Sequence, residues 1–307
     1  MTSQETKQKT RSGFIAIVGR PNVGKSTLMN YMVGQKVAIT ADKPQTTRNR
    51  IHGVVTHENS QIIFMDTPGI HKPKHRLGEH MVKIAVQTLR EVEAVLFLVD
   101  ATMPKGAGDE YIIEILKDVK KDTPIYLVIN KIDLIEDKQK LLEIITSYKD
   151  AFPFTEIIPI SAVKGDNVVR MRDLILDLLP EGPFYYPPDQ LTDHPERFIV
   201  AELIREKVLH LTREEVPHSV AVEVEQMQLK EDRNMLYIHA AIYTERDSQK
   251  AIIIGKQGSV LKKVGQMARL DIEKLMGSKV YLELWVKVKA DWRNREHMLR
   301  NFGFTEE

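Results

Sequence analysis

The sequence predicts an α/β protein in which a doubly wound sheet, with helices on both faces, precedes a smaller α+β domain. As far as residue 180, short apolar segments alternate with helical patterns, which is the rhythm of parallel strands joined by crossover helices. Residues 180–188 then contain four prolines that interrupt every pattern, as in a stiff connector. Beyond them the order of the elements changes, which indicates a second domain.

Apolar runs predict the strands of the first part, and amphipathic stretches predict its helices. We expect strands at 14–18, 51–55, 62–65, 94–99, 125–129 and 156–160, and helices at 25–33, 80–91, 109–121, 137–149 and 167–179. The second part is expected to have a helix at 197–211, strands at 220–225, 236–242 and 281–289, and helices on either side of 255–258. We therefore expect domains at 1–180 and 196–307, joined by a connector at 181–195, with the order α-β-β-α-α-β in the second.

The stretch GRPNVGKS, residues 19–26, fits the phosphate-loop pattern GxxxxGK[ST] and lies between a predicted strand and a predicted helix. Glycines let backbone N–H groups surround a phosphate, the helix N-terminus adds the positive end of its dipole, and Lys25 adds a point charge. The hydroxyl of Ser26 would bind Mg²⁺. We expect the phosphate contacts to come from Gly19, Asn22, Val23, Gly24, Lys25, Ser26 and Thr27.

Three later motifs, each at the end of a predicted strand, indicate that the bound nucleotide carries guanine. DTPG at 66–69 offers a carboxylate to Mg²⁺ and a glycine N–H to a γ-phosphate. In NKID at 130–133, Asp133 can accept from two guanine donors that adenine lacks. SAV at 161–163 offers a backbone N–H to the guanine O6. Each motif alone fits an ordinary turn or cap, but together and in this order they favour a guanine site formed by Asn130, Lys131, Asp133, Ser161, Ala162 and Val163.

These motifs resemble those of the translation-factor-related GTPases. The resemblance implies a switch threonine at Thr47, with Thr46 as the alternative, so that Ser26, Thr47 and Asp66 would be the metal ligands. The switch residues that it implies are Thr46, Thr47, Asp66, Thr67, Pro68, Gly69 and Ile70.

The chain departs from the small signalling GTPases at Ile70, where those enzymes carry a glutamine that orients the attacking water. Either turnover is slow or another group positions the water. His71 is a candidate for that role, although a mobile switch side chain beside the basic stretch 72–76 is the simpler interpretation. Asn22 stands where related GTPases without the glutamine use an asparagine to hold K⁺, so K⁺ is a candidate cofactor besides Mg²⁺.

GKQG at 255–258 lies between two consecutive helices of the second domain. The string alone carries little information, but its place in the α-β-β-α-α-β order resembles the type II KH domain. In that domain the GxxG turn lets a nucleic-acid backbone approach closely, and an apolar groove holds unpaired bases. The RNA contacts implied are Ile254, Gly255, Lys256, Gln257, Gly258, Ser259, Lys262 and Lys263. A plain helix–helix turn is the alternative.

The C-terminal stretch 291–300 predicts a short helix. Its Trp292, Arg293 and Arg295 either contact RNA, by stacking or pairing, or belong to a solvated face from which Trp292 turns inward.

The composition is that of an ordinary water-soluble globular protein, with 42% hydrophobic and 28% charged residues. The chain has no cysteine, which excludes disulfides and thiolate zinc sites. Its apolar runs are too short for a membrane span, and residues 1–12 lack the apolar core of a signal peptide. The net charge is +1, but residues 248–307 hold 12 Lys and Arg against 7 Asp and Glu, a local net charge of +5.

A GTPase domain followed by a type II KH domain resembles the Era family of bacterial GTPases, over about residues 13–300. The resemblance implies hydrolysis of GTP to GDP and phosphate with Mg²⁺, binding to the 3′ region of 16S rRNA, and a role in assembly of the small (30S) ribosomal subunit. It further implies a cytoplasmic monomer without a DNA partner, associated peripherally with the inner face of the cell membrane. Two alternatives are a GTP-binding module that scarcely hydrolyses its ligand, and a membrane or cell-cycle effector whose C-terminal domain binds protein.

Overall fold

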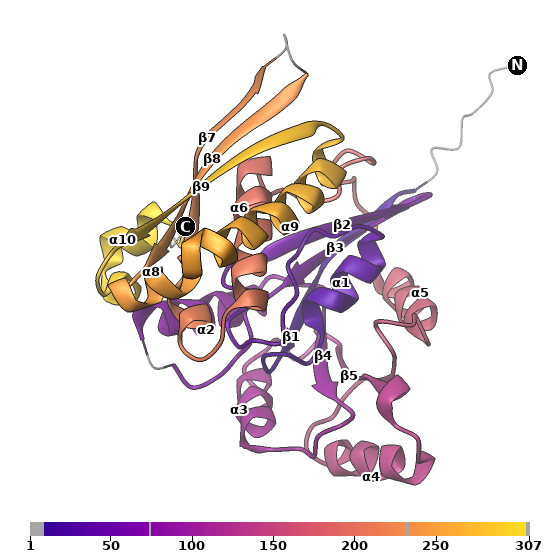
Figure 1. Cartoon of the computed structure of the whole chain (residues 1–307). Coiled ribbons are helices and arrows are strands. Elements are labelled where there is room, and N and C mark those ends of the chain that lie inside the picture. The colour runs from indigo at the N-terminus through magenta and orange to yellow at the C-terminus, as the bar shows by residue number, and fades with distance from the viewer. Residues whose placement is uncertain (1–8, 74, 231–233, 305–307) are drawn as a thin grey trace, which may run out of the picture. The chain divides into compact units, whose positions relative to one another are not determined.

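The computed structural model describes residues 9–73, 75–230 and 234–304 (Figure 1). Lys74 of the basic stretch and the first eight residues of the N-terminal segment therefore lie outside the described part. Contacts between Cα atoms divide the chain into two compact units. The first consists of residues up to 37, 49–71 and 81–193, and the second of 38–48, 72–80 and 194 onwards.

The first unit is built on a six-stranded sheet of order β2-β3-β1-β4-β5-β6. Its strands are β1 (Arg11–Gly19), β2 (Ile51–His57), β3 (Ser60–Asp66), β4 (Ala94–Asp100), β5 (Ile125–Asn130) and β6 (Glu156–Pro159). All neighbours run parallel except β2 and β3. The turn between these two strands is too short for a crossover, which forces them into a hairpin. The predicted doubly wound sheet is thus confirmed as a mixed sheet with an antiparallel edge.

In the described part of the chain, the α-helices of the first unit are α1 (Lys25–Val33), α3 (Ala107–Leu116), α4 (Lys138–Lys149), α5 (Val168–Leu178) and the part of α2 (Arg76–Thr88) that follows residue 80. One face of β1, β4 and β5 packs on α3, on α4 and on the part of α2 that follows residue 80. The prediction for α3 was too long by five residues: its last buried position is Leu116, and the polar residues after it have no core to contact. The prediction for α2, 80–91, was displaced toward the C-terminus.

Much of the proline-rich segment is bound to the first unit. Gly182 donates its N–H to the carbonyl of Thr10 at 3.0 Å, and Val54 in β2 donates to the carbonyl of Leu191 at 2.9 Å. Between them, the fully buried side chain of Gln61 accepts from two successive backbone N–H groups, at 185 and 186, and donates to the carbonyl of residue 186. The stretch expected as a connector therefore lies along the sheet as far as residue 191.

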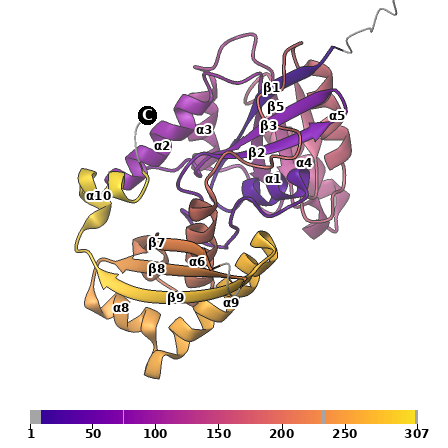
Figure 2. The ribbon, with the colours of Figure 1, turned by 90° about the horizontal axis from the view of Figure 1, so that it is seen from above.

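The second unit contains a three-stranded sheet of order β7-β8-β9, with β8 antiparallel to β7 and parallel to β9. Its elements are α6 (Glu196–Leu211), α7 (Val216–Ser219), β7 (Ala221–Lys230), β8 (Met235–Thr244), α8 (Asp247–Ile254), α9 (Ser259–Met276), β9 (Lys279–Val288) and α10 (Glu296–Asn301). Figure 2 shows the strands side by side with α8 and α9 along them. Apart from the short α7, which was not predicted, the expected order α-β-β-α-α-β is confirmed up to β9.

The C-terminal stretch is broken, not continuous. A single 3₁₀ turn at Trp292–Asn294 precedes α10. Trp292 is completely buried and donates its indole N–H to the carbonyl of Ser219 at 2.8 Å. Arg293 pairs with Glu245 at 2.5 Å. The inward interpretation of Trp292 is therefore correct, and stacking of its ring on RNA is excluded in this conformation because no face of the ring is accessible.

Among the described residues, no helix combines the length and the apolar character needed to cross a lipid bilayer.

Candidate functional site

The phosphate loop passes from β1 into α1 as its motif predicts. The backbone adopts left-handed φ angles at Asn22 (65°) and Gly24 (101°), and a Cβ at Gly24 would collide with the side chain of Asn130. Helix α1 begins at Lys25, so the first N–H groups of this helix have no partner within it and can donate to an anion.

Lys25 is buried at the start of this helix. Its ammonium group donates to the carbonyl of Gly19 at 3.1 Å and to that of Arg20 at 2.8 Å. Burial lowers the pKa of Lys25 to about 8, although the nearby carboxylate of Asp66 acts in the opposite direction. An incoming phosphate would restore the full positive charge, because a nearby opposite charge favours the charged form.

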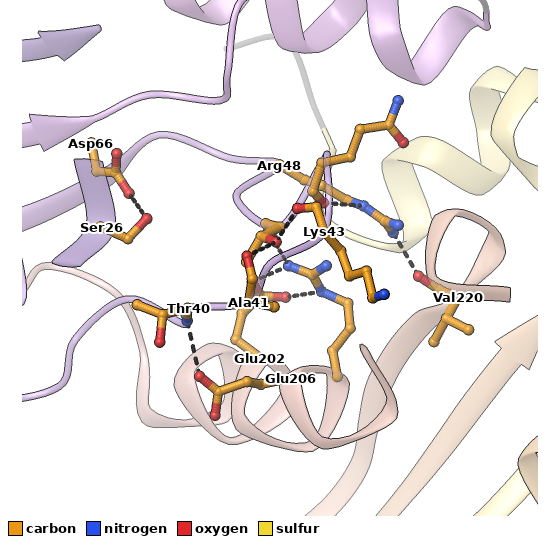
Figure 3. Close-up of polar contacts among 12 residues, drawn as sticks. Ser26, Thr40, Ala41, Lys43, Arg48, Asp66, Glu202, Glu206 and Val220 are labelled. Atoms are coloured by element: carbon orange, nitrogen blue, oxygen red, sulfur yellow. Dashed lines mark hydrogen bonds and ion pairs between the residues drawn. The ribbon is translucent and has the colours of Figure 1, made fainter. Parts of the chain in front are cut away.

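Two of the predicted metal ligands meet at the end of the sheet. Ser26 donates its hydroxyl to Asp66 Oδ2 at 2.6 Å (Figure 3). Asp66 is the last residue of β3 and is fully buried. Hard oxygen donors of this kind suit Mg²⁺, which usually binds one or two protein carboxylates and takes its other oxygen ligands from phosphates and water.

The DTPG turn lies directly against the phosphate loop. Thr67 donates its hydroxyl to the carbonyl of Ile17 at 2.8 Å, and the N–H of Ile70 donates to the carbonyl of Gly19 at 3.2 Å. Gly69 packs so closely on Pro21 that a Cβ would lie 2.8 Å from it. The side chain of Ile70 is buried in the core of the first unit. It therefore replaces the signalling glutamine with a packing residue.

The two guanine motifs are joined to the phosphate loop by Asn130. Its amide nitrogen donates to the carbonyl of Val23 at 2.9 Å, and its amide oxygen accepts from the N–H of Ala162 at 2.9 Å. Ser161 donates its hydroxyl to Asp133 Oδ1 at 2.6 Å. Asn130 thus links the phosphate loop to the two motifs that are predicted to bind the base.

Lys131 of the NKID motif is oriented by a residue that the sequence reasoning missed. Its ammonium group contacts Asp100 Oδ2 at 2.6 Å. Burial disfavours the charge of Asp100, but hydrogen bonds from Lys131 and Thr102 outweigh it and lower the pKa of this carboxyl group. Asp100 ends β4 directly beside Asn130 of β5. Its position, a carboxylate at the end of the strand next to β5, is the sequence feature that could have identified Asp100 as a partner of Lys131.

The switch threonines belong to the second unit, whereas Ser26 and Asp66 belong to the first. The predicted metal ligands are therefore not one cluster within either unit. Thr46 donates its hydroxyl to the carbonyl of Lys43 at 2.6 Å, and its own carbonyl accepts a hydrogen bond from the guanidinium group of Arg205 in α6. Thr47 is buried beside it.

Helix α6 also holds the start of this switch segment, 38–48. The N–H of Thr40 donates to Glu206 Oε1 at 2.9 Å (Figure 3). Glu206 is paired with Lys207 at 2.7 Å, and Lys207 also contacts Asp271 of α9. The carboxylate that binds the switch segment is therefore linked to the helix that follows the GxxG turn.

Arg48 closes the switch segment and is almost completely buried in the second unit. It donates to the carbonyls of Val220 at 2.6 Å and of Pro217 and His218 at 3.2 Å each. Its guanidinium carbon lies 5.8 Å from the centre of the Trp292 ring. We call this set of partners the Arg48 socket. The sequence offered no signal for it, because the socket residues are far away along the chain.

Gly258 of the GxxG turn lines a groove of about 520 Å³ between α9 and β9. Gly255 and Gly258 both have positive φ, at 71° and 77°, and a Cβ on Gly255 would strike Val260. Ile254 is half-buried, whereas Lys256, Gln257 and Ser259 are exposed. The groove is lined by Gly258, Leu261, Lys262, Gly265, Gln266, Arg269, Val280, Tyr281, Leu282 and Leu284.

Of the two predicted lysines on α9, the groove lining includes Lys262 and not Lys263, although both are exposed. Sequence reasoning missed Leu261, Gly265 and Arg269, which recur every four residues on one face of α9. That period, counted from the GxxG turn, would have identified them.

Known protein families match both parts of this chain. Residues 14–131 match a family described as 50S ribosome-binding GTPase, and residues 215–293 match the KH domain family. A solved structure of Era in complex with Mg-GDPNP and nucleotides 1506–1542 of 16S ribosomal RNA is 46% identical, with a TM-score of 0.91 over 97% of this chain and 100% of that one. A variant of Aquifex aeolicus Era bound to GDP·AlF₄⁻ matches with the same identity, coverage and TM-score.

Proposed function

This chain belongs to the Era family of GTPases, and we propose that it couples GTP hydrolysis to binding of the 3′ region of 16S rRNA during assembly of the 30S ribosomal subunit. The observation that carries the proposal is the groove beside the GxxG turn. An open, mostly apolar groove with Lys262 and Arg269 at its wall suits unpaired bases with a phosphate backbone alongside.

We assign a role in nucleotide binding to each motif. Lys25 and the N–H groups of residues 22–27 take the β- and γ-phosphates, and Asp133 takes the guanine edge, with Asn130 fixing both loops. Ser26 and Asp66 would hold Mg²⁺, and we expect Thr47 to be the third protein ligand. When bound, the metal ion neutralises charge on the phosphates.

In hydrolysis, a water molecule attacks the γ-phosphate in line with the bond that breaks. The positive groups already positioned in the site stabilise the negative charge of the transition state. Ile70 cannot orient the water, because its side chain is apolar and buried. Asn22 is exposed in a left-handed turn of the phosphate loop, where its side chain is available to hold K⁺ near the phosphates. His71, whose Nδ1 lies 2.9 Å from the carbonyl of Gly69, stays a candidate for positioning the water.

Control of RNA binding rests on the switch segment. Binding of GTP and Mg²⁺ would recruit Thr47 and thereby compete with the contacts that α6 makes to Thr40 and Thr46. Glu206 and Lys207 would pass this change to Asp271 on α9. The nucleotide state would thus alter the helix that carries the groove.

The test is RNA binding with an acidic GxxG turn. Lys256→Asp with Gln257→Asp should weaken binding of an RNA oligonucleotide from the 3′ end of 16S rRNA at least tenfold, because phosphate contacts position nucleic acids at this turn. Aspartate tolerates the left-handed φ of residue 257. Arg213→Asp with Gln228→Asp changes the charge equally at exposed positions of the same unit and serves as the control.

Unchanged RNA affinity in the folded GxxG variant would overturn the RNA part of the proposal and favour a protein-binding effector. GTP binding without measurable turnover, with or without RNA, would instead favour a pure binding module. Peripheral association with the inner membrane, a cytoplasmic location and a monomeric state rest on the family resemblance. Sedimentation of the purified chain with and without vesicles tests the first and last of these.

A further inference from the structure

A residue of the phosphate loop is anchored from outside the nucleotide motifs. Arg20 Nε lies 3.0 Å from Asp109 Oδ1, and the side chain of Asp109 is completely buried. The contact is an ion pair and not a linear hydrogen bond, since neither atom meets the hydrogen-bond geometry. Asp109 lies in the first turn of α3, so the helix after β4 holds the loop after β1.

Asp109 is itself held in place. Its Oδ2 accepts from the N–H of Gly106 at 3.0 Å, which caps α3. The buried Tyr148 of α4 also donates to this carboxylate; burial, and then the charge of Asp109, raises the pKa of the Tyr148 phenol, so it remains a donor. A carboxylate fixed from two sides offers a rigid point of attachment.

The start of α3 is shaped to admit the arginine. A Cβ on Gly108 would lie 2.7 Å from Arg20 Cδ, and one on Gly106 would lie 3.7 Å from Nη1. The stem of Arg20 therefore passes over helical backbone that has no side chain at the point of closest approach.

Arg20 is coupled to the reacting groups through its backbone. Its carbonyl accepts from Lys25 Nζ at 2.8 Å, the shorter of the two carbonyl contacts of that ammonium group. Arg20 thus pairs with Asp109 through its side chain and binds Lys25 through its backbone carbonyl.

We propose that Asp109 is a positioning residue for GTP hydrolysis, which acts through Arg20 to fix the carbonyl that orients Lys25. This inference rests on the phosphate-loop assignment made above. Affinity for the phosphates is spread over many backbone N–H groups and the helix N-terminus. The position of Lys25 matters most where charge develops in the transition state, so its displacement lowers kcat more than it lowers affinity.

The first variant is Asp109→Asn, which keeps the volume and leaves an amide oxygen to cap α3. We expect kcat to fall about tenfold or more, since a misplacement of about 1 Å costs up to about 10²-fold, while the Kd for GTP changes less than about threefold. Glu110→Gln, at the exposed next position of the same helix, is the matched control and should retain both values. The ³¹P resonance of the β-phosphate of bound GDP should shift in Asp109→Asn and not in the control.

A double-mutant cycle shows whether Asp109 acts through Arg20. Arg20→Ala and Asp109→Asn should each cost about the same in kcat, their combination should cost no more, and Arg20→Lys should recover much of the rate. If Arg20→Ala is inactive while Asp109→Asn turns over normally, Arg20 acts directly and the proposal is wrong. It is equally wrong if Asp109→Asn lowers only thermal stability, with kcat per bound nucleotide and the ³¹P resonance unchanged.

Lys25→Ala separates this inference from the assignment on which it rests. Loss of hydrolysis in Lys25→Ala beside normal turnover in Asp109→Asn would overturn only the role of Asp109. Normal hydrolysis in Lys25→Ala would overturn the phosphate-loop assignment itself.

Discussion

Replacement of Arg48 by alanine is expected to destabilise the second unit, although Arg48 lies next to a switch threonine in the sequence. The side chain is 2% exposed and donates to the carbonyls of Val220, Pro217 and His218. Truncation would leave these buried carbonyls without their cationic partner. Each such hydrogen bond from a charged group contributes about 1.5–3 kcal/mol.

The sum of these contributions overstates the loss. Burial, followed by the charge of Arg205, lowers the pKa of Arg48 well below its ordinary value, so removal of the cation also relieves a desolvation cost and a repulsion. We therefore expect a net loss of about 3 kcal/mol. With an m-value of about 1.5 kcal/mol per molar urea, the unfolding midpoint should fall by about 2 M.

Trp292 provides the assay, because its ring borders Arg48 in the same socket. The chain has two tryptophans, and the other, Trp285, is 54% exposed. In a Trp285→Phe background, the emission of Trp292 reports unfolding of the second unit alone. Arg213→Ala, at an exposed position of this unit, is the control. A midpoint shift for Arg48→Ala no larger than that of the control would refute the reasoning that the socket stabilises the unit.

Three further predictions concern the nucleotide site. Asp133→Asn should lower GTP affinity by about 10²-fold or more and raise affinity for XTP, whose base has a carbonyl where guanine has its amino group; a competition titration that still prefers GTP would contradict the guanine assignment. Because the pKa of Lys25 is about 8 in the unliganded protein and a bound phosphate raises it, GDP binding should take up most of one proton at pH 8.5 and almost none at pH 7; calorimetry in buffers of different ionisation enthalpy measures this uptake, and equal uptake at both pH values would exclude it. If Asn22 holds K⁺, hydrolysis should be severalfold faster in KCl than in NaCl at equal ionic strength, and Asn22→Ala should abolish the difference; equal rates in the wild type argue against the cation.

The parts of the site that could be predicted from the sequence are those whose chemistry requires a local pattern. The phosphate loop needs left-handed backbone at fixed places before a helix, and the proposed base site needs Asn130 and Asp133 at a fixed spacing. Both patterns can therefore be recognised in short stretches of sequence. The roles of Asp109 and of the Arg48 socket could not be predicted from the sequence. In both cases the partners are distant along the chain, and only packing brings them together. Trp292 shows the same limit of prediction from sequence. The helical pattern around it is compatible with an exposed or a buried ring, and the hydrogen bond to the carbonyl of Ser219 shows that the ring is buried.

The proline-rich segment along the first unit has a consequence for self-association of the chain. Strand β2 lies at the edge of the six-stranded sheet, and such an edge is a template for pairing with the strands of another molecule. The N–H of Val54 donates to the carbonyl of Leu191, and the side chain of Gln61 donates to the carbonyl of residue 186. These bonds place the protein's own backbone against that edge. A chain cut at residue 180 would keep every nucleotide motif and lose this cover. We therefore expect it to self-associate, and a chain cut after residue 193 to remain monodisperse.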